Sequence, residues 1–317
     1  MLIETAWAKV NLALHVRMRR ADGYHDIESL FAFAEDGDVL SAEPADALSL
    51  AIQGPFAEAL EPFPARRNRL AGQERLSIQH LEHFPTEKPV STFSGSALAD
   101  EAADNLVLRA ARALATTFSI DAGARLVLDK RVPVAAGLGG GSADAAAALR
   151  LLARLWRIDA NDPRVGAIAA ELGADVPACF ASRTLRGESR GDVLLAADGV
   201  ALSGMPLLLA NPRIPLPTGP VFKGWDGVDR GPLGQGDPLK AALEGRNDLQ
   251  PPAIALVPEI GPLVTMLGSL PGAVLARMSG SGASCFALFD TPAARAAAAG
   301  ALRARWPDYW CLETALK

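Results

Sequence analysis

Four of the five residues from Gly137 to Gly141 are glycine, and Ser142 follows them directly. Residues 124–132 (ARLVLDKRV) precede this run and predict a strand, whereas residues 142–157 follow it and predict a helix. The helix prediction depends on apolar residues that recur on one face, namely Ala145, Leu149, Leu152 and Trp156. A strand, a glycine loop and a long helix in this order require a fold that mixes sheet and helix.

The chemistry of this loop favours an anionic ligand. Glycine allows backbone N–H groups to approach an oxyanion without interference from a Cβ atom. The helix N-terminus contributes unpaired N–H donors and a partial positive charge. Ser142 is predicted either to cap the helix or to reach a phosphate-bound Mg²⁺. The loop is therefore predicted to bind phosphate, with a flexible loop and a simple serine cap as the structural alternative.

Two familiar phosphate-binding loops do not match. A Walker A loop requires a Gly-Lys dipeptide, and the chain contains none. Gly137, Gly139 and Ser142 approximate a dinucleotide fingerprint, and Asp159 lies at about the right distance beyond it. In that fingerprint, however, the acidic residue ends a second strand, and here it follows a helix. A different class of phosphate loop is therefore expected.

Sequence patterns predict further elements on both sides of this loop. Residues 3–16 alternate and predict a strand, and the Asp22-Gly23 turn leads into a second apolar run over residues 27–33. Helices are predicted over residues 104–118, where Asp104 or Asn105 can act as the cap, over residues 163–172 and over residues 292–304. Residues 273–278 and 285–290 predict strands that flank the segment SGSGAS, and a last short strand ends the chain.

The chain is expected to form two α+β domains, over residues 1–195 and 196–317. The second half is richer in proline and glycine, particularly over residues 204–236. Residues 61–96 mix prolines with both signs of charge and are predicted to form a surface insertion. His80 and His83 lie in this segment. They are predicted to be solvated histidines of a loop rather than a pair of metal ligands.

Composition excludes several classes of protein. The 317 residues carry a net charge of −5, which argues against a nucleic-acid-binding protein. No apolar run reaches about 18 residues, so no membrane span is expected. The three cysteines form no CxxC pair, which argues against a disulfide framework or a zinc site. Glu4 and Lys9 interrupt the first apolar stretch, so no signal peptide is expected and the cytoplasm is the predicted location.

Three motifs, in order, resemble those of the GHMP small-molecule kinases. AWAKVNLALHV resembles the first motif, PVAAGLGGGSADAAAAL the second and RMSGSGASCFALF the third. Further segments are similar to the branch of that family that phosphorylates a cytidine-diphosphate-linked methylerythritol: RADGYHDIESLF, DNLVLRAA, LGADVPACF, PTGPVF and RNDL. The resemblance implies a two-domain GHMP kinase fold, with a ribosomal-S5-like N-terminal domain and a ferredoxin-like C-terminal domain. It places the active site in the cleft between them.

The resemblance also implies the catalytic pair. The alternation over residues 3–16 puts Lys9 and Asn11 on one strand face but does not decide between solvent and a cleft. The local pattern alone predicts that Asp175 is the N-cap of a helix, because Pro177 follows shortly inside that helix. The resemblance instead places Lys9 in the cleft beside Asp175, which would accept the proton of the substrate hydroxyl during transfer of the γ-phosphate.

ATP and Mg²⁺ are the cofactors that the resemblance implies. The expected ATP site comprises the glycine loop with the residues before it, and two residues on the adenine side: Pro133, Val134, Ala135, Ala136, Gly137, Leu138, Gly139, Gly140, Gly141, Ser142, Asn105 and Lys130. Asn105 is equally well explained as a helix cap. Ser142 is the candidate ligand for the metal, and Asp144, two residues further along, is expected to lie near the bound ion.

The resemblance assigns the acceptor site to a second group of residues. Tyr24 and Phe222 would stack on the cytosine, and His25 would hydrogen-bond to it. The remaining candidates are Asn11, Thr218, Gly280, Ser281 and Gly282. The expected reaction is ATP-dependent phosphorylation of the 2-hydroxyl of the cytidyl substrate, in the methylerythritol phosphate route to isoprenoids.

Two alternatives remain open from the sequence. One is another GHMP kinase that acts on a mevalonate-type or homoserine-type alcohol and differs at Tyr24, His25 and Phe222. The other is a nucleotide-binding relative without catalytic activity. In each case the expected partner is a small molecule, with no nucleic acid or membrane involved, and the protein is expected to be a monomer or a weak homodimer.

Overall fold

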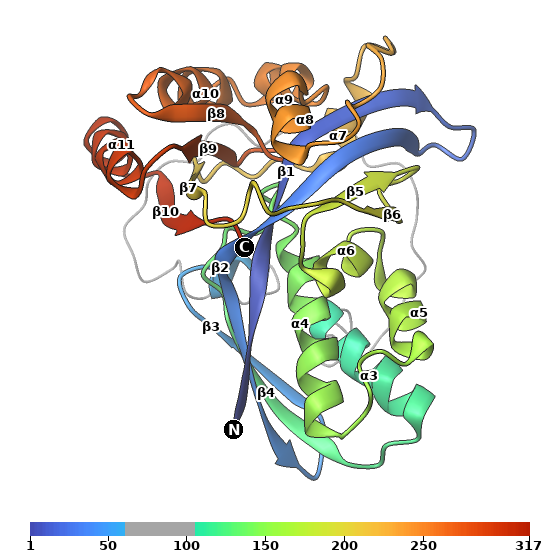
Figure 1. Ribbon diagram of the computed structural model, residues 1–317. Helices are drawn as coiled ribbons and strands as arrows, with labels where there is room; N and C mark the ends of the chain where they lie inside the picture. The colour runs from blue at the N-terminus through green and yellow to red at the C-terminus, as the bar shows by residue number, and fades with distance from the viewer. Residues whose placement is uncertain (61–104) are drawn as a thin grey trace, which may run out of the picture.

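The computed structural model describes residues 1–60 and 105–317, and these residues form two β-sheets with helices packed on them (Figure 1). The predicted insertion over residues 61–96, with His80 and His83, lies outside the described residues, as does Asp104.

The first sheet contains six strands, and its longest pair begins the chain. β1 (Leu2–Arg19) and β2 (His25–Ala45) run antiparallel as a hairpin. The other strands are β3 (Ser49–Gln53), β4 (Gly123–Asp129), β5 (Leu185–Glu188) and β6 (Val193–Ala196). The order is β3-β4-β2-β5-β6, and β1 pairs with β2 outside this path. A short 3₁₀ helix covers Ala57–Leu60.

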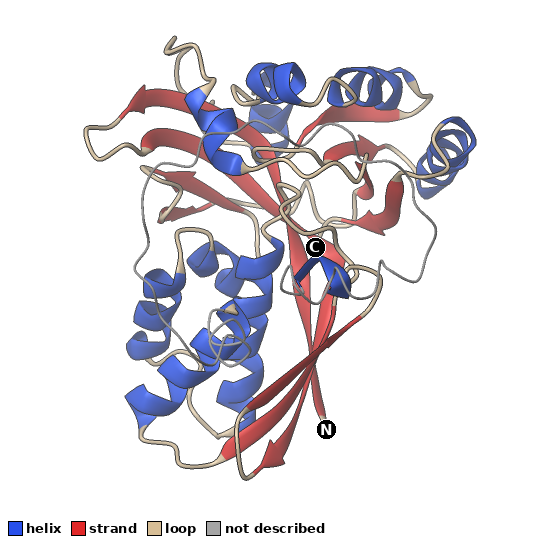
Figure 2. Ribbon diagram, turned by 180° about the vertical axis from the view of Figure 1, so that it is seen from behind, coloured by secondary structure: helices blue, strands red, loops and turns tan. Residues whose placement is uncertain are grey.

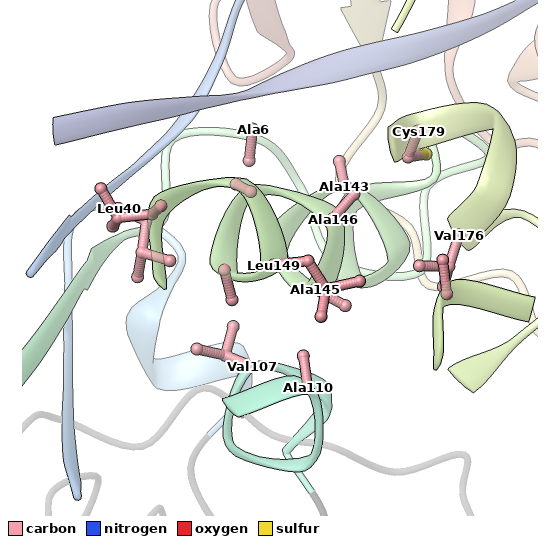
Figure 3. Packing of buried hydrophobic residues seen from close by; sticks show 14 of the residues in the cluster. Ala6, Leu40, Val107, Ala110, Ala143, Ala145, Ala146, Leu149, Val176 and Cys179 are labelled. Carbon is pink, nitrogen blue, oxygen red and sulfur yellow. The ribbon is translucent and has the colours of Figure 1, made fainter. Parts of the chain in front are cut away.

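Four helices pack together against this first sheet (Figure 1). They are α3 (Leu106–Phe118), α4 (Gly140–Leu155), α5 (Pro163–Leu172) and α6 (Val176–Ala181). α4 is buried along most of its length, because its alanines allow neighbours to approach closely. Figure 3 shows these alanines between Ala6 of β1 and Val107 and Ala110 of α3. The central position of α4 fixes where its N-terminus opens.

The second sheet is antiparallel, in the order β10-β7-β9-β8. Its strands are β7 (Pro206–Asn211), β8 (Ala273–Met278), β9 (Cys285–Phe289) and β10 (Trp310–Ala315). The helices of this half are α7 (Thr218–Lys223), α8 (Pro238–Glu244), α9 (Gln250–Leu256), α10 (Ile260–Ser269) and α11 (Pro292–Arg305). Figure 2 shows most of them gathered at the top of the view, beyond the strands.

The hairpin of β1 and β2 joins the two halves. The backbone N–H of Leu14 donates to the carbonyl of Arg246 at 2.8 Å, and Ala34 forms a bridge with Leu316. A shared apolar cluster contains Val10 and Leu12 of β1 together with residues of β7 and β9. Because one hairpin belongs to both cores, the halves meet along a continuous buried seam.

The predicted elements are confirmed, most of them with small shifts at their ends, but the second strand, predicted over residues 27–33, extends over His25–Ala45. The largest local difference concerns the glycine loop, because α4 begins at Gly140 with Gly139 as its cap residue. Ser142 therefore lies in the first turn of α4, and the expectation that it caps the helix is wrong. The predicted domain boundary falls inside β6 and stays a prediction; the change from one sheet to the other occurs between Ala196 and Pro206. Within the described residues, no helix is long and apolar enough to cross a membrane.

Candidate active site

A cavity of about 930 Å³ lies where the two halves meet. Segments far apart in sequence line it: β1, the start of β2, the glycine loop, the residues before α6, the helix α7 and the turn after β8. Of the predicted site residues, the lining includes Lys9, Asn11, Tyr24, His25, Ala135, Ala136, Gly137, Gly139, Gly140, Gly141, Ser142, Asp175, Thr218, Phe222, Gly280 and Ser281. The fold thus brings most of both predicted groups into one pocket.

Lys9 and Asp175 form an ion pair in this cavity. Lys9 is 4% exposed, and its Nζ lies 2.8 Å from Oδ1 of Asp175. The same Nζ lies 4.5 Å from the centre of the Phe31 ring. Asp175 occupies the cap position of α6, but its side chain makes no capping hydrogen bond. The carboxylate points to Lys9 instead. The face of β1 that carries Lys9 therefore lines the cleft.

The glycines of the loop are required by close packing on two sides. Gly137 and Gly139 have positive φ values of 75° and 64°. A Cβ on Gly137 would lie 2.3 Å from the carbonyl oxygen of Ser279, and one on Gly139 would lie 3.1 Å from Cε of Lys9. The loop is therefore held between β1 and the turn after β8.

The first turn of α4 supplies donors to the cavity. The N–H groups of Gly140, Gly141 and Ser142 precede the first bond of the helix, which runs from Ala143 to Gly139 at 2.8 Å. The cap residue Gly139 makes no side-chain bond to them. Backbone donors at a helix N-terminus bind phosphate oxygens well. These three N–H groups, here called the glycine cradle, therefore fit the triphosphate of a nucleotide.

The turn after β8 is tied to the glycine loop by Ser279. Its hydroxyl donates to the carbonyl of Gly137 at 2.8 Å and accepts the N–H of Asn11 at 3.1 Å. The N–H of Ser284 donates to the carbonyl of Ala136 at 3.1 Å. This network brings Gly280 and Ser281 to the pocket wall, whereas Gly282 lies outside the lining.

Asn11 presents an unused acceptor near this turn. Its Nδ2 donates to the hydroxyl of Ser29 at 2.8 Å, which orients the amide. Its Oδ1 is buried and has no hydrogen-bond partner within the described residues. A Cβ on Gly280 would lie 3.2 Å from that oxygen. A buried acceptor without a partner is suited to a ligand hydroxyl or amine.

Aromatic side chains define the other end of the cavity. Tyr24 is 58% exposed, whereas His25 is buried. The His25 and Phe222 ring centres lie 5.1 Å apart with planes tilted by 41°, and Trp225 meets His25 edge-on at 5.7 Å. The hydroxyl of Thr218 lies 3.0 Å from that of Ser281, which connects α7 to the turn after β8. This end offers flat apolar surfaces for a ring.

The two residues expected on the adenine side lie outside the lining of the cavity. Asn105 caps α3, because its side chain accepts the N–H of Val107 at 2.9 Å. Lys130 is buried, and its Nζ donates to Asp38 at 2.5 Å and to Asp144 at 2.8 Å. Nucleotide contact by these two residues stays a prediction. Pro133 and Val134, which precede the loop, and Leu138, which lies within it, are also outside the lining.

The buried triad of Lys130, Asp38 and Asp144 stabilises the elements on either side of the glycine loop. Asp38 Oδ1 also accepts the N–H groups of Arg131 and Val132, at 2.6 and 2.9 Å. Burial raises the pKa of Asp144 to about 7, although the charge of Lys130 opposes that rise. Burial alone would lower the pKa of Lys130, but the two carboxylates outweigh it and raise that pKa. The triad joins β2, the end of β4 and the first turns of α4.

Sequence reasoning missed several residues at this site. Asp38 lies in the middle of β2, at the end of the run Glu35-Asp36-Gly37-Asp38, and nothing in the sequence distinguishes it from its acidic neighbours. Arg19, Arg190 and Lys223 also line the cavity, close to its aromatic end. Arg19 ends β1, Lys223 ends α7 and Arg190 lies in a turn. No sequence pattern links these three positions, so only the fold brings them together.

The described residues contain no group of three or more His, Cys, Asp or Glu side chains placed to hold a metal ion. Ser142 and Asp175 both line the cavity and carry oxygen atoms, which are the ligands that Mg²⁺ prefers. Because Mg²⁺ usually takes only one or two protein oxygens beside waters and substrate phosphates, these residues fit that ion.

Two family models match the chain and define its class. The GHMP kinases N terminal domain matches residues 105–183, and the GHMP kinases C terminal domain matches residues 231–308. GHMP kinases use ATP. A crystal structure of a homoserine kinase from Cytophaga hutchinsonii shares the fold, with a TM-score of 0.61 and 14% identity over 99% of this chain and 96% of that one. The fold is that of a GHMP kinase, which confirms the predicted α+β class.

Closer relatives narrow this class. The chain is 55% identical to the 4-diphosphocytidyl-2-C-methyl-D-erythritol kinase of Rhizorhabdus wittichii, over 99% of this chain and 94% of the relative. It is 31% identical to a protein solved as 4-(cytidine 5'-diphospho)-2C-methyl-D-erythritol kinase, with a TM-score of 0.72 and 99% of both chains covered. The chain therefore belongs to the 4-diphosphocytidyl-2-C-methyl-D-erythritol kinase family.

Proposed function

We propose that this protein transfers the γ-phosphate of ATP to the 2-hydroxyl of 4-diphosphocytidyl-2-C-methyl-D-erythritol. ADP and the 2-phosphate of the cytidyl substrate are the products, and the reaction serves isoprenoid precursor synthesis. The observation that carries this proposal is the Lys9–Asp175 ion pair, which lies in the same cavity as the glycine cradle and the aromatic end.

Asp175 is the proposed proton acceptor. The substrate hydroxyl oxygen forms a bond to the γ-phosphorus, the bond from that phosphorus to the β–γ bridging oxygen breaks, and the hydroxyl proton passes to Asp175. The Nζ of Lys9 lies 2.8 Å from Oδ1 and holds the carboxylate in place before the transfer. The same ammonium stabilises negative charge on the reacting oxygens.

The glycine cradle is the proposed site of the ATP phosphates. Three N–H groups at the start of α4 provide hydrogen bonds and the positive end of the helix dipole. When bound, Mg²⁺ would neutralise phosphate charge, and Ser142 would be its protein ligand, with Asp175 nearby in the same lining. Asn105 and Lys130 stay proposed contributors on the adenine side.

The aromatic end is the proposed site of the cytosine. Tyr24 and Phe222 provide surfaces for stacking, which is worth about 1–3 kcal/mol per base. Asn11, Thr218, Gly280, Ser281 and Gly282 would surround the remainder of the acceptor. Both substrates are small polyanions, and we expect the protein to act on them in the cytoplasm as a monomer or a weak homodimer, with no nucleic acid or membrane as partner.

A comparison of three alcohols tests the proposal. ADP release is measured with ATP, Mg²⁺ and either the cytidyl substrate, homoserine or mevalonate, and we expect turnover only with the cytidyl substrate. CDP should inhibit by competition with that substrate. Turnover with a different alcohol would contradict the proposed cytosine site, whereas the proposed phosphate site would still stand. If the folded protein bound ATP but none of the three alcohols reacted, the proposed activity would be wrong.

A further inference from the structure

We infer that Arg19 is a positioning residue that fixes His25 with its proton on Nδ1 and thereby makes the site select cytosine over uracil. This inference rests on the proposed function for the identity of the base. The assignment of the proton itself rests on the contacts of Arg19 alone.

The contact between Arg19 and His25 follows from the register of the first hairpin. The two residues are directly opposite each other, as the last pair of β1 and β2. The turn between them is fixed, because the N–H of Arg20 donates to the carbonyl of Tyr24 at 2.8 Å and Gly23 has a φ of 86°. Cross-strand neighbours of this kind are held close by the sheet itself.

The chemistry of the contact assigns the proton. Nε of Arg19 lies 3.4 Å from Nε2 of His25 in hydrogen-bond geometry. A guanidinium only donates, so Nε2 must accept, and a neutral imidazole then carries its proton on Nδ1. Arg19 is held from its other side as well, because its Nη2 donates to the carbonyl of Lys223 at 3.4 Å. Arg19 therefore connects the histidine to the end of the helix that carries Phe222.

The surroundings of His25 keep the ring neutral. Burial, and then the positive charge of Arg19, lowers the pKa of His25. Arg190 and Lys223 line the same cavity and are also cations. The neighbouring carboxylate of Asp26 is 2.8 Å from Arg20 and is neutralised there. If the His25 ring were protonated, Nε2 could no longer accept the hydrogen bond from Arg19, and the two positive charges would lie next to each other.

The remaining ring nitrogen gives the site its selectivity. Nδ1 of His25 has no hydrogen-bond partner within the described residues, and His25 lines the cavity. Where this N–H meets N3 of the base it matches cytosine, whose N3 accepts, whereas N3 of uracil donates and would oppose it. A site built to donate to one base leaves the other with an unpaired polar group, which is what generates discrimination.

The proton position can be measured without any substrate. Long-range ¹H–¹⁵N spectra of the wild-type protein at pH 8 should show His25 protonated on Nδ1, with the signal assigned by its loss in His25→Asn. In Arg19→Met the proton should move to Nε2 and the pKa should rise. His15 is an internal control, because its Nδ1 lies 3.2 Å from the carbonyl of Gly231 and its Nε2 accepts the N–H of Arg246. Its signals should not change.

The selectivity is tested by calorimetric titration with CDP and UDP at pH 7.5. We expect the wild-type protein to bind CDP more tightly, and Arg19→Met to reduce the ratio of the two affinities by about fivefold to tenfold, as expected for one hydrogen bond. Arg17→Met is the matched control, because Arg17 lies on the same strand and pairs with Asp229 and Glu28 outside the cavity; its ratio should stay at the wild-type value.

A proton on Nε2 in the wild-type protein would overturn the assignment, and so would a preference for CDP that survives Arg19→Met. Absence of kinase activity in a protein with the expected spectra and the expected preference would instead contradict the proposed reaction. The two failures are therefore distinguishable.

Discussion

Single residues carry the chemistry of this cavity through the contacts that orient them. Lys9 is on a strand, where its charge would ordinarily face water, but it is 4% exposed and paired with Asp175. Alternation in the sequence identified its face, the family resemblance predicted that this face is the cleft, and the structure places Lys9 in the lining of the cavity. The partner lies 166 positions away in sequence and in a loop, so no local pattern links the two.

Removal of either charge of this pair should slow phosphoryl transfer strongly and preserve the fold. Asp175→Asn removes the proton acceptor, and Lys9→Met removes charge stabilisation and leaves the carboxylate without its cation. Each should lower kcat by at least about 100-fold. Steady-state kinetics, with circular dichroism as the control for folding, checks this. Near-normal kcat in either folded variant would contradict the proposed roles.

The binding of cytidine should depend on pH in a defined direction. Because the pKa of His25 is lowered, the neutral ring persists to a lower pH than in free histidine. We expect the affinity for cytidine, which has no phosphate to titrate, to be constant from pH 8 to about 6.5 and to weaken below that. Titration calorimetry measures it. In Arg19→Met the loss should begin at a higher pH, and loss at the same pH in both proteins would contradict this account.

At the scale of elements, the glycine loop depends on a buried triad that holds its neighbours together. Lys130 follows β4, Asp38 lies in β2 and Asp144 lies in α4. The sequence predicted each element, because periodicity and turn residues are local signals. It did not predict the triad, because Lys130 and Asp38 are 92 positions apart and only the sheet register brings them together.

Loss of the cation in this triad should be costly. Lys130→Met would leave two buried carboxylates without their counter-ion, and we expect a loss of about 3–5 kcal/mol in the free energy of unfolding. Urea denaturation measures this value. Arg131→Met is the matched control, because Arg131 is exposed and its side chain pairs with Asp129 at the surface. Equal stability of both variants would contradict a structural role for the triad.

Asp144 should make stability depend on pH. Its pKa is about 7 in the folded protein and ordinarily 3.8, so the folded state binds more protons between these values. Its contribution to the free energy of unfolding is therefore complete below about pH 4 and is lost as the pH rises through 7. Thermal denaturation of Asp144→Asn from pH 5 to 8 should show a flatter pH dependence than the wild-type protein. An identical dependence would contradict the raised pKa.

At the scale of the whole molecule, the two halves share the first hairpin. Arg277 of β8 illustrates the connection, because its guanidinium donates to the carbonyls of Leu12, Ala242 and Gly245. Burial lowers the pKa of Arg277 to about 10. The family resemblance predicted two domains with a cleft between them, whereas this seam depends on pairings more than 200 positions apart and is visible only in the structure.

Unfolding should therefore be cooperative across both halves. Arg277→Met would leave three carbonyls without their donor, with a cost of at least about 2 kcal/mol in the free energy of unfolding. Urea denaturation followed by tryptophan fluorescence and by circular dichroism should give coincident transitions in both proteins. Two separated transitions in the wild-type protein would show that the halves unfold independently, against this expectation.

In the proposed reaction, the protein phosphorylates the 2-hydroxyl of the cytidyl substrate bound in this cavity. The most direct measurement is a phosphorus NMR time course of the wild-type protein with ATP, Mg²⁺ and that substrate. Because C2 carries a methyl group and no hydrogen, we expect a new phosphomonoester singlet that forms at the rate of ADP release. The diphosphate signals of the cytidyl group should be retained. ADP without a new ester, or a new ester signal split by a neighbouring proton, would contradict it.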